Sequence, residues 1–158
     1  MKDMKALLLN ILFLSCLVSA QAQTEQEINW LTFEQLSDSL DVQPKETLLF
    51  FYTDWCSYCH KMMKEGFKNP DIVRYINTHY YAVRFDAESI NPVNFDGQVL
   101  KNTSKHKVPG HFHEVALLFN PPGKKLIFPQ LILLKNDFSI KKNTNKYLSS
   151  KELLKYVK

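Results

Sequence analysis

A continuous apolar run directly before two closely spaced cysteines limits the possible folds of this chain more than any other feature. Residues 47–53, TLLFFYT, have the length and composition of a strand buried on both faces of a sheet. Cys56 and Cys59 follow it, at the start of a helical pattern that covers residues 56–67. The cysteine spacing by itself fits a redox pair, a haem anchor, half of a metal site or a structural disulfide.

The first 22 residues have the pattern of a secretory signal peptide. Lysines form a charged start, residues 6–20 form an apolar segment, and residues 20–22, Ala-Gln-Ala, form a small-residue cleavage site. The apolar segment is too short to span a bilayer comfortably, so a retained membrane anchor is the less favoured interpretation. We therefore expect residues 23–158 to be a single exported, periplasmic domain, with lipid attachment at Cys16 as a less favoured alternative.

Cleavage at this site would leave Cys56 and Cys59 as the cysteines of the mature chain. Small exported domains that depend on disulfides for stability usually have several of them. A bridge that closes so short a loop also constrains the unfolded chain little. A purely structural disulfide is therefore less favoured than a reactive pair.

Helix and strand patterns alternate along the rest of the chain, which indicates an α/β fold. Residues 23–30 are expected to be a flexible start, and residues 88–109 a polar, turn-rich insertion or long loop. Capping boxes mark two of the helix starts. The expected elements are helices at 33–40, 56–67, 70–80, 111–119 and 150–157 and strands at 47–53, 81–85, 126–134 and 138–141.

This order resembles the thioredoxin fold over nearly all of the mature chain. The specific markers are Trp55 directly before Cys56, the Cys56/Cys59 pair, and Phe128-Pro129 where the family carries a cis-proline. The motif Trp-Cys-Ser-Tyr-Cys-His is similar to that of exported thioredoxin-like proteins. The resemblance implies a central mixed β-sheet flanked by helices, with a loop or helical insertion before the cis-proline strand.

The resemblance also implies a thiol-disulfide oxidoreductase that uses no cofactor beyond its own redox-active disulfide. Cys56 would lie at a helix N-terminus, where unpaired backbone N–H groups favour the thiolate, and would be the nucleophile. Cys59, one turn further on, would resolve the mixed disulfide. His60 follows Cys56 by four and would share its helix face, so a protonated imidazole would stabilise the thiolate. Packing or solvent exposure is the alternative role for His60, and Trp55 completes the expected catalytic group.

The substrate is expected to bind beside the cysteines. By the resemblance, Phe128 offers its backbone groups to an extended substrate chain by strand addition. Proline makes a cis bond accessible at low cost, which accounts for Pro129. Tyr58, inside the motif, is the third expected substrate-binding residue.

The expected partners are protein thiols or disulfides and a membrane redox partner, and the chain is expected to be a monomer. The formal net charge is +4 at pH 7 without a dense basic patch, so no nucleic-acid partner is expected.

Two positions depart from the thioredoxin pattern. Thioredoxins proper have a buried acid six residues before the first cysteine, and this chain has Phe50 there. Proton transfer at Cys59 must therefore use water, His60 or another group. The dipeptide Ser57-Tyr58 also replaces the family's Gly-Pro, and both changes leave the redox potential and the direction of electron flow open.

Covalent haem attachment is one competing function, because Cys-x-x-Cys-His is also its pattern. Small haem domains are helical, whereas this motif follows a buried strand, and no methionine beyond Met63 could be the distal ligand. A histidine would have to serve instead, from the set His79, His106, His111 and His113.

A carrier of Cu(I) or zinc and an inactive binding module of the same fold are the other competing functions. A carrier would bind the soft ion with both cysteines and a histidine. His111 and His113 lie two apart on the expected helix and so do not share a face. Retention of both cysteines with Trp55 and Pro129 argues against an inactive module.

Overall fold

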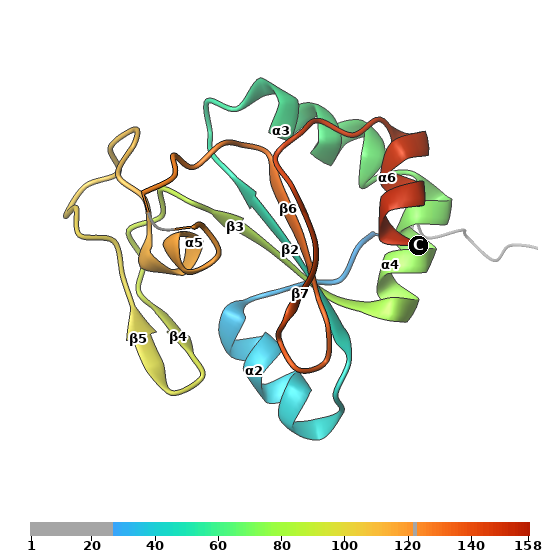
Figure 1. Cartoon of the computed structure of the whole chain (residues 1–158), viewed down its shortest axis with the longest axis horizontal. Coiled ribbons are helices and arrows are strands. Elements are labelled where there is room, and N and C mark those ends of the chain that lie inside the picture. The colour runs from blue at the N-terminus through green and yellow to red at the C-terminus, as the bar shows by residue number, and fades with distance from the viewer. Residues whose placement is uncertain (1–26, 122) are drawn as a thin grey trace, which may run out of the picture.

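A mixed sheet of five strands forms the centre of the computed structural model, which describes residues 27–121 and 123–158 (Figure 1). The expected signal peptide, its cleavage site and Cys16 lie outside the described residues. The strands, in their order across the sheet, are β1 (Trp30–Leu31), β3 (Tyr80–Asp86), β2 (Glu46–Tyr52), β6 (Gln130–Leu134) and β7 (Ile140–Thr144).

β2 is the central strand, and it is buried on both faces as the sequence predicted. It pairs with β3 in parallel and with β6 in antiparallel orientation. Phe50 belongs to the apolar core on one side of the sheet and Phe51 to the core on the other, and both are 0% exposed. Alternate side chains of one strand thus hold together two apolar layers.

Helices cover both faces of this sheet (Figure 1). On one face lie α3 (Ser57–Lys61), the π-helical turn η1 (Met62–Gly66), α4 (Pro70–His79) and α6 (Ser150–Val157). On the other face lie α2 (Phe33–Val42) and α5 (Glu114–Leu118). The architecture is the α/β fold with a mixed central sheet flanked by helices that the sequence predicted.

Both predicted capping boxes are present. The Thr32 side chain accepts from the Gln35 N–H, and the Gln35 side chain accepts from the Thr32 N–H. At the start of α6, the Glu152 carboxylate accepts from the Ser149 N–H and from the Ser149 hydroxyl. These local hydrogen bonds satisfy backbone donors that a helix start leaves free, which fixes both helix starts.

The start of the described chain is ordered, so the expectation of a flexible segment is wrong for its last residues. Ile28 is buried in the core, and β1 pairs with β3 in parallel. Asn77 of α4 holds this segment with its side chain, which donates to the Glu27 carbonyl and accepts from the Asn29 N–H. Burial of Ile28 and these hydrogen bonds offset the entropy of ordering the segment.

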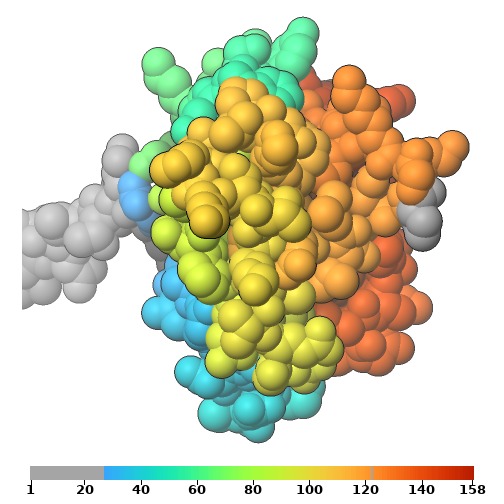
Figure 2. All heavy atoms as spheres, turned by 90° about the vertical axis from the view of Figure 1, so that its left-hand side faces the viewer, coloured from blue at the N-terminus to red at the C-terminus, as the bar shows by residue number. Residues whose placement is uncertain are grey.

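The insertion before β6 contains more regular structure than the sequence predicted. β4 (Val93–Phe95) and β5 (Gln98–Leu100) form a hairpin. Its turn has Asp96 and Gly97 both in the left-handed region (φ of 51° and 69°). The insertion covers the face seen in Figure 2, in yellow and orange, between α2 and the segment that carries the cysteines.

Three elements that follow the insertion have other bounds than the sequence predicted. The helix expected at 111–119 covers only Glu114–Leu118, because the buried His113 caps it: its Nδ1 accepts from the Val115 N–H. His111 and His113 therefore precede the helix. The strand expected at 126–134 begins at Gln130, after the proline that cannot donate to the ladder. The last strand lies at Ile140–Thr144 rather than 138–141.

In the part of the chain that the structure describes, no helix is long and apolar enough to cross a membrane.

Candidate active site

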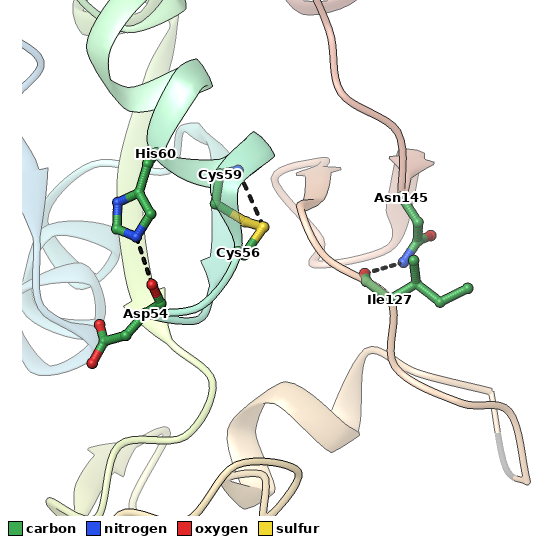
Figure 3. The surroundings of a disulfide bond; sticks show 6 residues. All are labelled: Asp54, Cys56, Cys59, His60, Ile127 and Asn145. Carbon is green, nitrogen blue, oxygen red and sulfur yellow. Dashed lines mark hydrogen bonds between the residues drawn. A yellow bond between two sulfur atoms is a disulfide. The ribbon is translucent and has the colours of Figure 1, made fainter.

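Cys56 and Cys59 form a disulfide at the start of α3 (Figure 3). Their Cα atoms are 5.2 Å apart. Cys56 is the N-cap residue of α3, and its Sγ accepts a hydrogen bond from the Cys59 N–H at 3.1 Å. The Cys56 N–H in turn donates to the Thr53 carbonyl, 3.1 Å away, directly after β2. The central strand therefore delivers the first cysteine to the helix start.

The two sulfur-bearing residues differ in their exposure. Cys56 is 5% exposed and Cys59 is 0% exposed, so solvent reaches the pair from the side of Cys56. Phe50 lies in the same apolar core as both cysteines, and its ring contacts that of Phe67 at a centroid distance of 4.9 Å. An aromatic ring thus fills the position at which thioredoxins proper carry a buried acid.

The structure does not bring the imidazole of His60 to the sulfur atoms. Its Nε2 donates to the Asp54 carbonyl at 2.8 Å, and Figure 3 shows the ring turned toward Asp54 and away from the disulfide. The backbone N–H of His60 does bond to the Cys56 carbonyl at 3.1 Å, as expected for a residue four positions on. Helical spacing thus correctly placed the backbone of His60 but not its ring.

Trp55 is anchored to a buried carboxylate that the sequence analysis did not identify. Its indole Nε1 donates to Glu88 Oε1 at 3.0 Å, and the Gly110 N–H donates to the same oxygen at 2.6 Å. Glu88 is 2% exposed, whereas Trp55 is 57% exposed. The signal that could have found Glu88 is its place just after β3, because the carboxyl ends of parallel neighbours β2 and β3 meet at one edge of the sheet.

A cation of the insertion lies against the loop that carries the cysteines. Lys107 Nζ forms ion pairs with Asp54, two residues before Cys56, and with Asp86, the last residue of β3. Hydrogen bonds to these two carboxylates raise the pKa of Lys107 above its ordinary value. Sequence reasoning missed this cluster as well, because Lys107 lies 53 residues after Asp54.

The expected substrate-binding residues lie on two sides of the motif. The Phe128–Pro129 peptide bond is cis, as the resemblance implies. The Phe128 ring contacts Trp55 at a centroid distance of 6.1 Å. Tyr58 is 60% exposed and contacts Tyr147, with ring centroids 5.6 Å apart.

A hydrogen bond fixes the chain just before the proline. The Ile127 carbonyl accepts from the Asn145 side-chain amide at 2.9 Å, across from the disulfide in Figure 3. No hydrogen bond joins the Phe128 backbone to any residue in 27–121 or 123–158. The Phe128 peptide groups are thus unpaired, while the carbonyl of the preceding residue, Ile127, is held.

The histidines considered as metal ligands are not gathered with the cysteines. Burial lowers the pKa of His113, whose ring lies between the Val115 N–H and the Asn91 carbonyl. Within residues 27–121 and 123–158, no group of three or more His, Cys, Asp and Glu side chains is arranged to hold a metal ion.

Comparison with known proteins agrees with this geometry. The family model described as a thioredoxin-like domain matches residues 34–145. No curated protein matches the chain.

Solved structures show the same fold at low sequence identity. A DsbH oxidoreductase is 14% identical and aligns over 88% of both chains with a TM-score of 0.58. A thioredoxin from Thermus thermophilus is 15% identical and aligns over 83% of this chain and 85% of its own with a TM-score of 0.56. A disulphide isomerase from Xylella fastidiosa Temecula1 is 15% identical, over 83% of this chain and 95% of its own, with a TM-score of 0.52.

Proposed function

Because the chain belongs to the thioredoxin-like domain family, we propose that it is a thiol-disulfide oxidoreductase that acts on protein thiols or disulfides. The observation that carries the proposal is the Cys56–Cys59 disulfide at the start of α3, with its solvent-accessible side at Cys56. Cys56 is the nucleophile, because an incoming sulfur atom meets Cys56 before the fully buried Cys59.

The reaction needs only the two cysteines and a substrate disulfide. In the reduced protein, the Cys56 thiolate attacks one substrate sulfur, a Cys56–substrate bond forms, and the other substrate sulfur leaves and takes up a proton. The Cys59 thiol then loses its proton and attacks Cys56 Sγ, which releases the second substrate thiol. Two electrons pass from the protein dithiol to the substrate, and the reverse sequence oxidises a substrate dithiol.

Backbone geometry supports the nucleophile. The Cys59 N–H that donates to Cys56 Sγ in the disulfide can donate to the thiolate after reduction, and hydrogen bonds to an anion are stronger than those to a neutral acceptor. This hydrogen bond therefore favours the thiolate of Cys56 over its thiol. The ring of His60 does not contact the sulfur, so any further stabilisation of the thiolate by His60 would act through its charge.

Because residue 50 is Phe, no carboxylate at this position can accept the proton of Cys59. The Phe50 ring is fully buried beside the cysteines and can neither accept nor donate a proton. We propose that water, which reaches the site when the mixed disulfide forms, accepts the proton of Cys59.

The substrate chain is proposed to lie along Phe128 and Pro129. The unpaired N–H and carbonyl of Phe128 can bond to an extended segment as a neighbouring strand does. The exposed face of Trp55 and the ring of Phe128 form an aromatic surface beside that edge. Tyr58 offers a second exposed ring inside the motif.

The signal-peptide pattern of the first 22 residues supports export to the periplasm. There, a membrane redox partner would return the pair to its active state after each turnover. A monomer is sufficient for this chemistry, since both cysteines and the Phe128 edge come from one chain.

Reduction of insulin disulfides by the purified mature domain, with dithiothreitol as the electron source, tests the proposal. Replacing Cys56 with Ser should abolish the rate above the dithiothreitol background. An unchanged rate in Cys56→Ser would show that the pair is not the reactive group.

A further inference from the structure

Ion pairs join the insertion to the loop between β2 and α3, which leads to Cys56. None of the paired residues takes part in the proposed reaction. Lys107 extends from the segment between β5 and α5 and pairs with Asp54 and Asp86 at once. Asp54 belongs to the loop between β2 and α3, and Asp86 lies opposite Tyr52 in the parallel β2–β3 register. One side chain of the insertion therefore joins the ends of both central strands at the edge where Cys56 lies.

Two carboxylates in this cluster share one ammonium group. Asp54, Asp86 and the buried Glu88 bring three carboxylates to this edge of the sheet. Among the described residues, Lys107 is the cation that forms ion pairs with Asp54 and Asp86. The side chains of Asp86, Lys107 and Asp54 are 16%, 38% and 67% exposed, so solvent screens the Asp86 ion pair only in part and the Asp54 ion pair more strongly.

The loop that Lys107 holds also carries the bonds that place the motif. The Asp54 carbonyl accepts from the His60 ring, and the preceding residue, Thr53, accepts from the Cys56 N–H. A cation that fixes the Asp54 side chain therefore acts within two residues of the nucleophile.

We propose that Lys107 is a positioning residue that sets the reduction potential of the Cys56–Cys59 pair, an inference that rests on the proposed function. In the reduced protein the Cys56 thiolate adds one more negative charge two residues after Asp54, at the edge of the sheet where β3 ends with Asp86. The ammonium group offsets the repulsion from these carboxylates and so stabilises the thiolate. A stabilised thiolate favours the reduced state and makes the pair more oxidising.

The potential can be measured by equilibrating the mature domain with glutathione. One glutathione disulfide takes two electrons and two protons from the dithiol, which yields the Cys56–Cys59 disulfide and two glutathione thiols. The fraction of disulfide is read by alkylation and intact mass. Lys107→Met removes the charge and keeps most of the stem, Lys107→Arg keeps the charge, and Lys105→Met removes an exposed charge from the same segment.

We expect Lys107→Met to raise the equilibrium constant for disulfide formation roughly threefold, within the range for partly exposed ion pairs. At 29.6 mV per factor of ten, this is a midpoint about 14 mV more reducing. Lys107→Arg and Lys105→Met should keep the wild-type midpoint. Raising the salt concentration should narrow the difference between Lys107→Met and wild type, because ions screen exposed charges.

If Lys107→Met does not fold, Asp54→Asn tests the same electrostatics. Removal of this negative charge should shift the midpoint in the direction opposite to that expected for Lys107→Met, toward a more oxidising value. A reversible wild-type pair with the same midpoint in Lys107→Met would overturn this inference and leave the proposed function intact. Equal shifts in Lys107→Met and Lys105→Met would overturn it too, because the effect would then be one of net charge. A wild-type domain without a reversible pair would overturn the proposed function itself.

Discussion

The indole of Trp55 donates a hydrogen bond to Glu88, a carboxylate that is almost completely buried 33 residues further along the chain. Glu88 accepts a second hydrogen bond from the backbone of Gly110 through the same oxygen. The residue before the reactive cysteine is thus bonded to the first residue of the insertion, and the same carboxylate oxygen is bonded to Gly110, directly after the last residue of the insertion. The position of the aromatic ring beside Phe128 depends on this attachment.

Replacing Glu88 with Ala should therefore damage both stability and turnover. The change removes the shared acceptor of two part-buried hydrogen bonds, from Trp55 and from Gly110, each of which contributes about 0.5–1.5 kcal/mol. We expect the urea midpoint to fall accordingly and the kcat/KM for insulin reduction to fall severalfold. Glu88→Gln keeps an acceptor oxygen and should retain most of both quantities; equal losses in the two variants would show that the hydrogen bonds do not matter.

Removal of the Asn145 side chain should weaken substrate binding without changing the redox chemistry. Asn145 holds the Ile127 carbonyl, one residue before the Phe128 edge that we assign to the substrate. Asn145→Ala should raise the KM for a protein disulfide about threefold to tenfold, while the reduction potential stays at the wild-type value. Asn143→Ala, an exposed change on β7 two residues earlier, is the matched control. A shifted potential in Asn145→Ala would contradict a role confined to the substrate edge.

The buried His113 should make the folded state sensitive to acid. Burial lowers its pKa from the ordinary value of 6.5, so between these two pKa values the unfolded chain binds more protons than the folded one. The stability that the neutral ring contributes is complete above pH 6.5 and falls as the pH drops below it, until the folded-state pKa is passed.

Urea unfolding of wild type and His113→Asn between pH 8 and pH 5 measures this effect. Asn keeps a side-chain acceptor for the start of α5 but does not titrate. We expect a smaller loss of stability toward pH 5 in His113→Asn than in wild type. His111→Gln, which changes an exposed histidine, should retain the wild-type slope. Parallel curves for all three proteins would exclude His113 as the source.

Features written in contiguous residues were predictable from the sequence. The apolar run of β2, the cysteine pair and the boxes at Thr32 and Ser149 each depend on neighbours within a few positions, and the structure contains all of them. The order of these local features was sufficient to indicate the fold.

Features that depend on the path of the insertion were not predictable in this way. Glu88 and Lys107 read as ordinary loop residues, because their partners Trp55 and Asp54 lie 33 and 53 positions away. The ring of His60 was misplaced for a related reason. Helical spacing gives the side of a helix, but a carbonyl of the preceding loop decides where a polar ring points.

The account depends most directly on Cys56 as the attacking sulfur. Cys59→Ser mature domain, incubated with a substrate protein that contains one disulfide, should accumulate a mixed disulfide, because the resolving thiol is absent. Intact mass and peptide mapping should place the substrate on Cys56, and Cys56→Ser under the same conditions should trap far less. Equal trapping on Cys59 in Cys56→Ser, or no adduct in either variant, would contradict the assignment of Cys56 as the nucleophile.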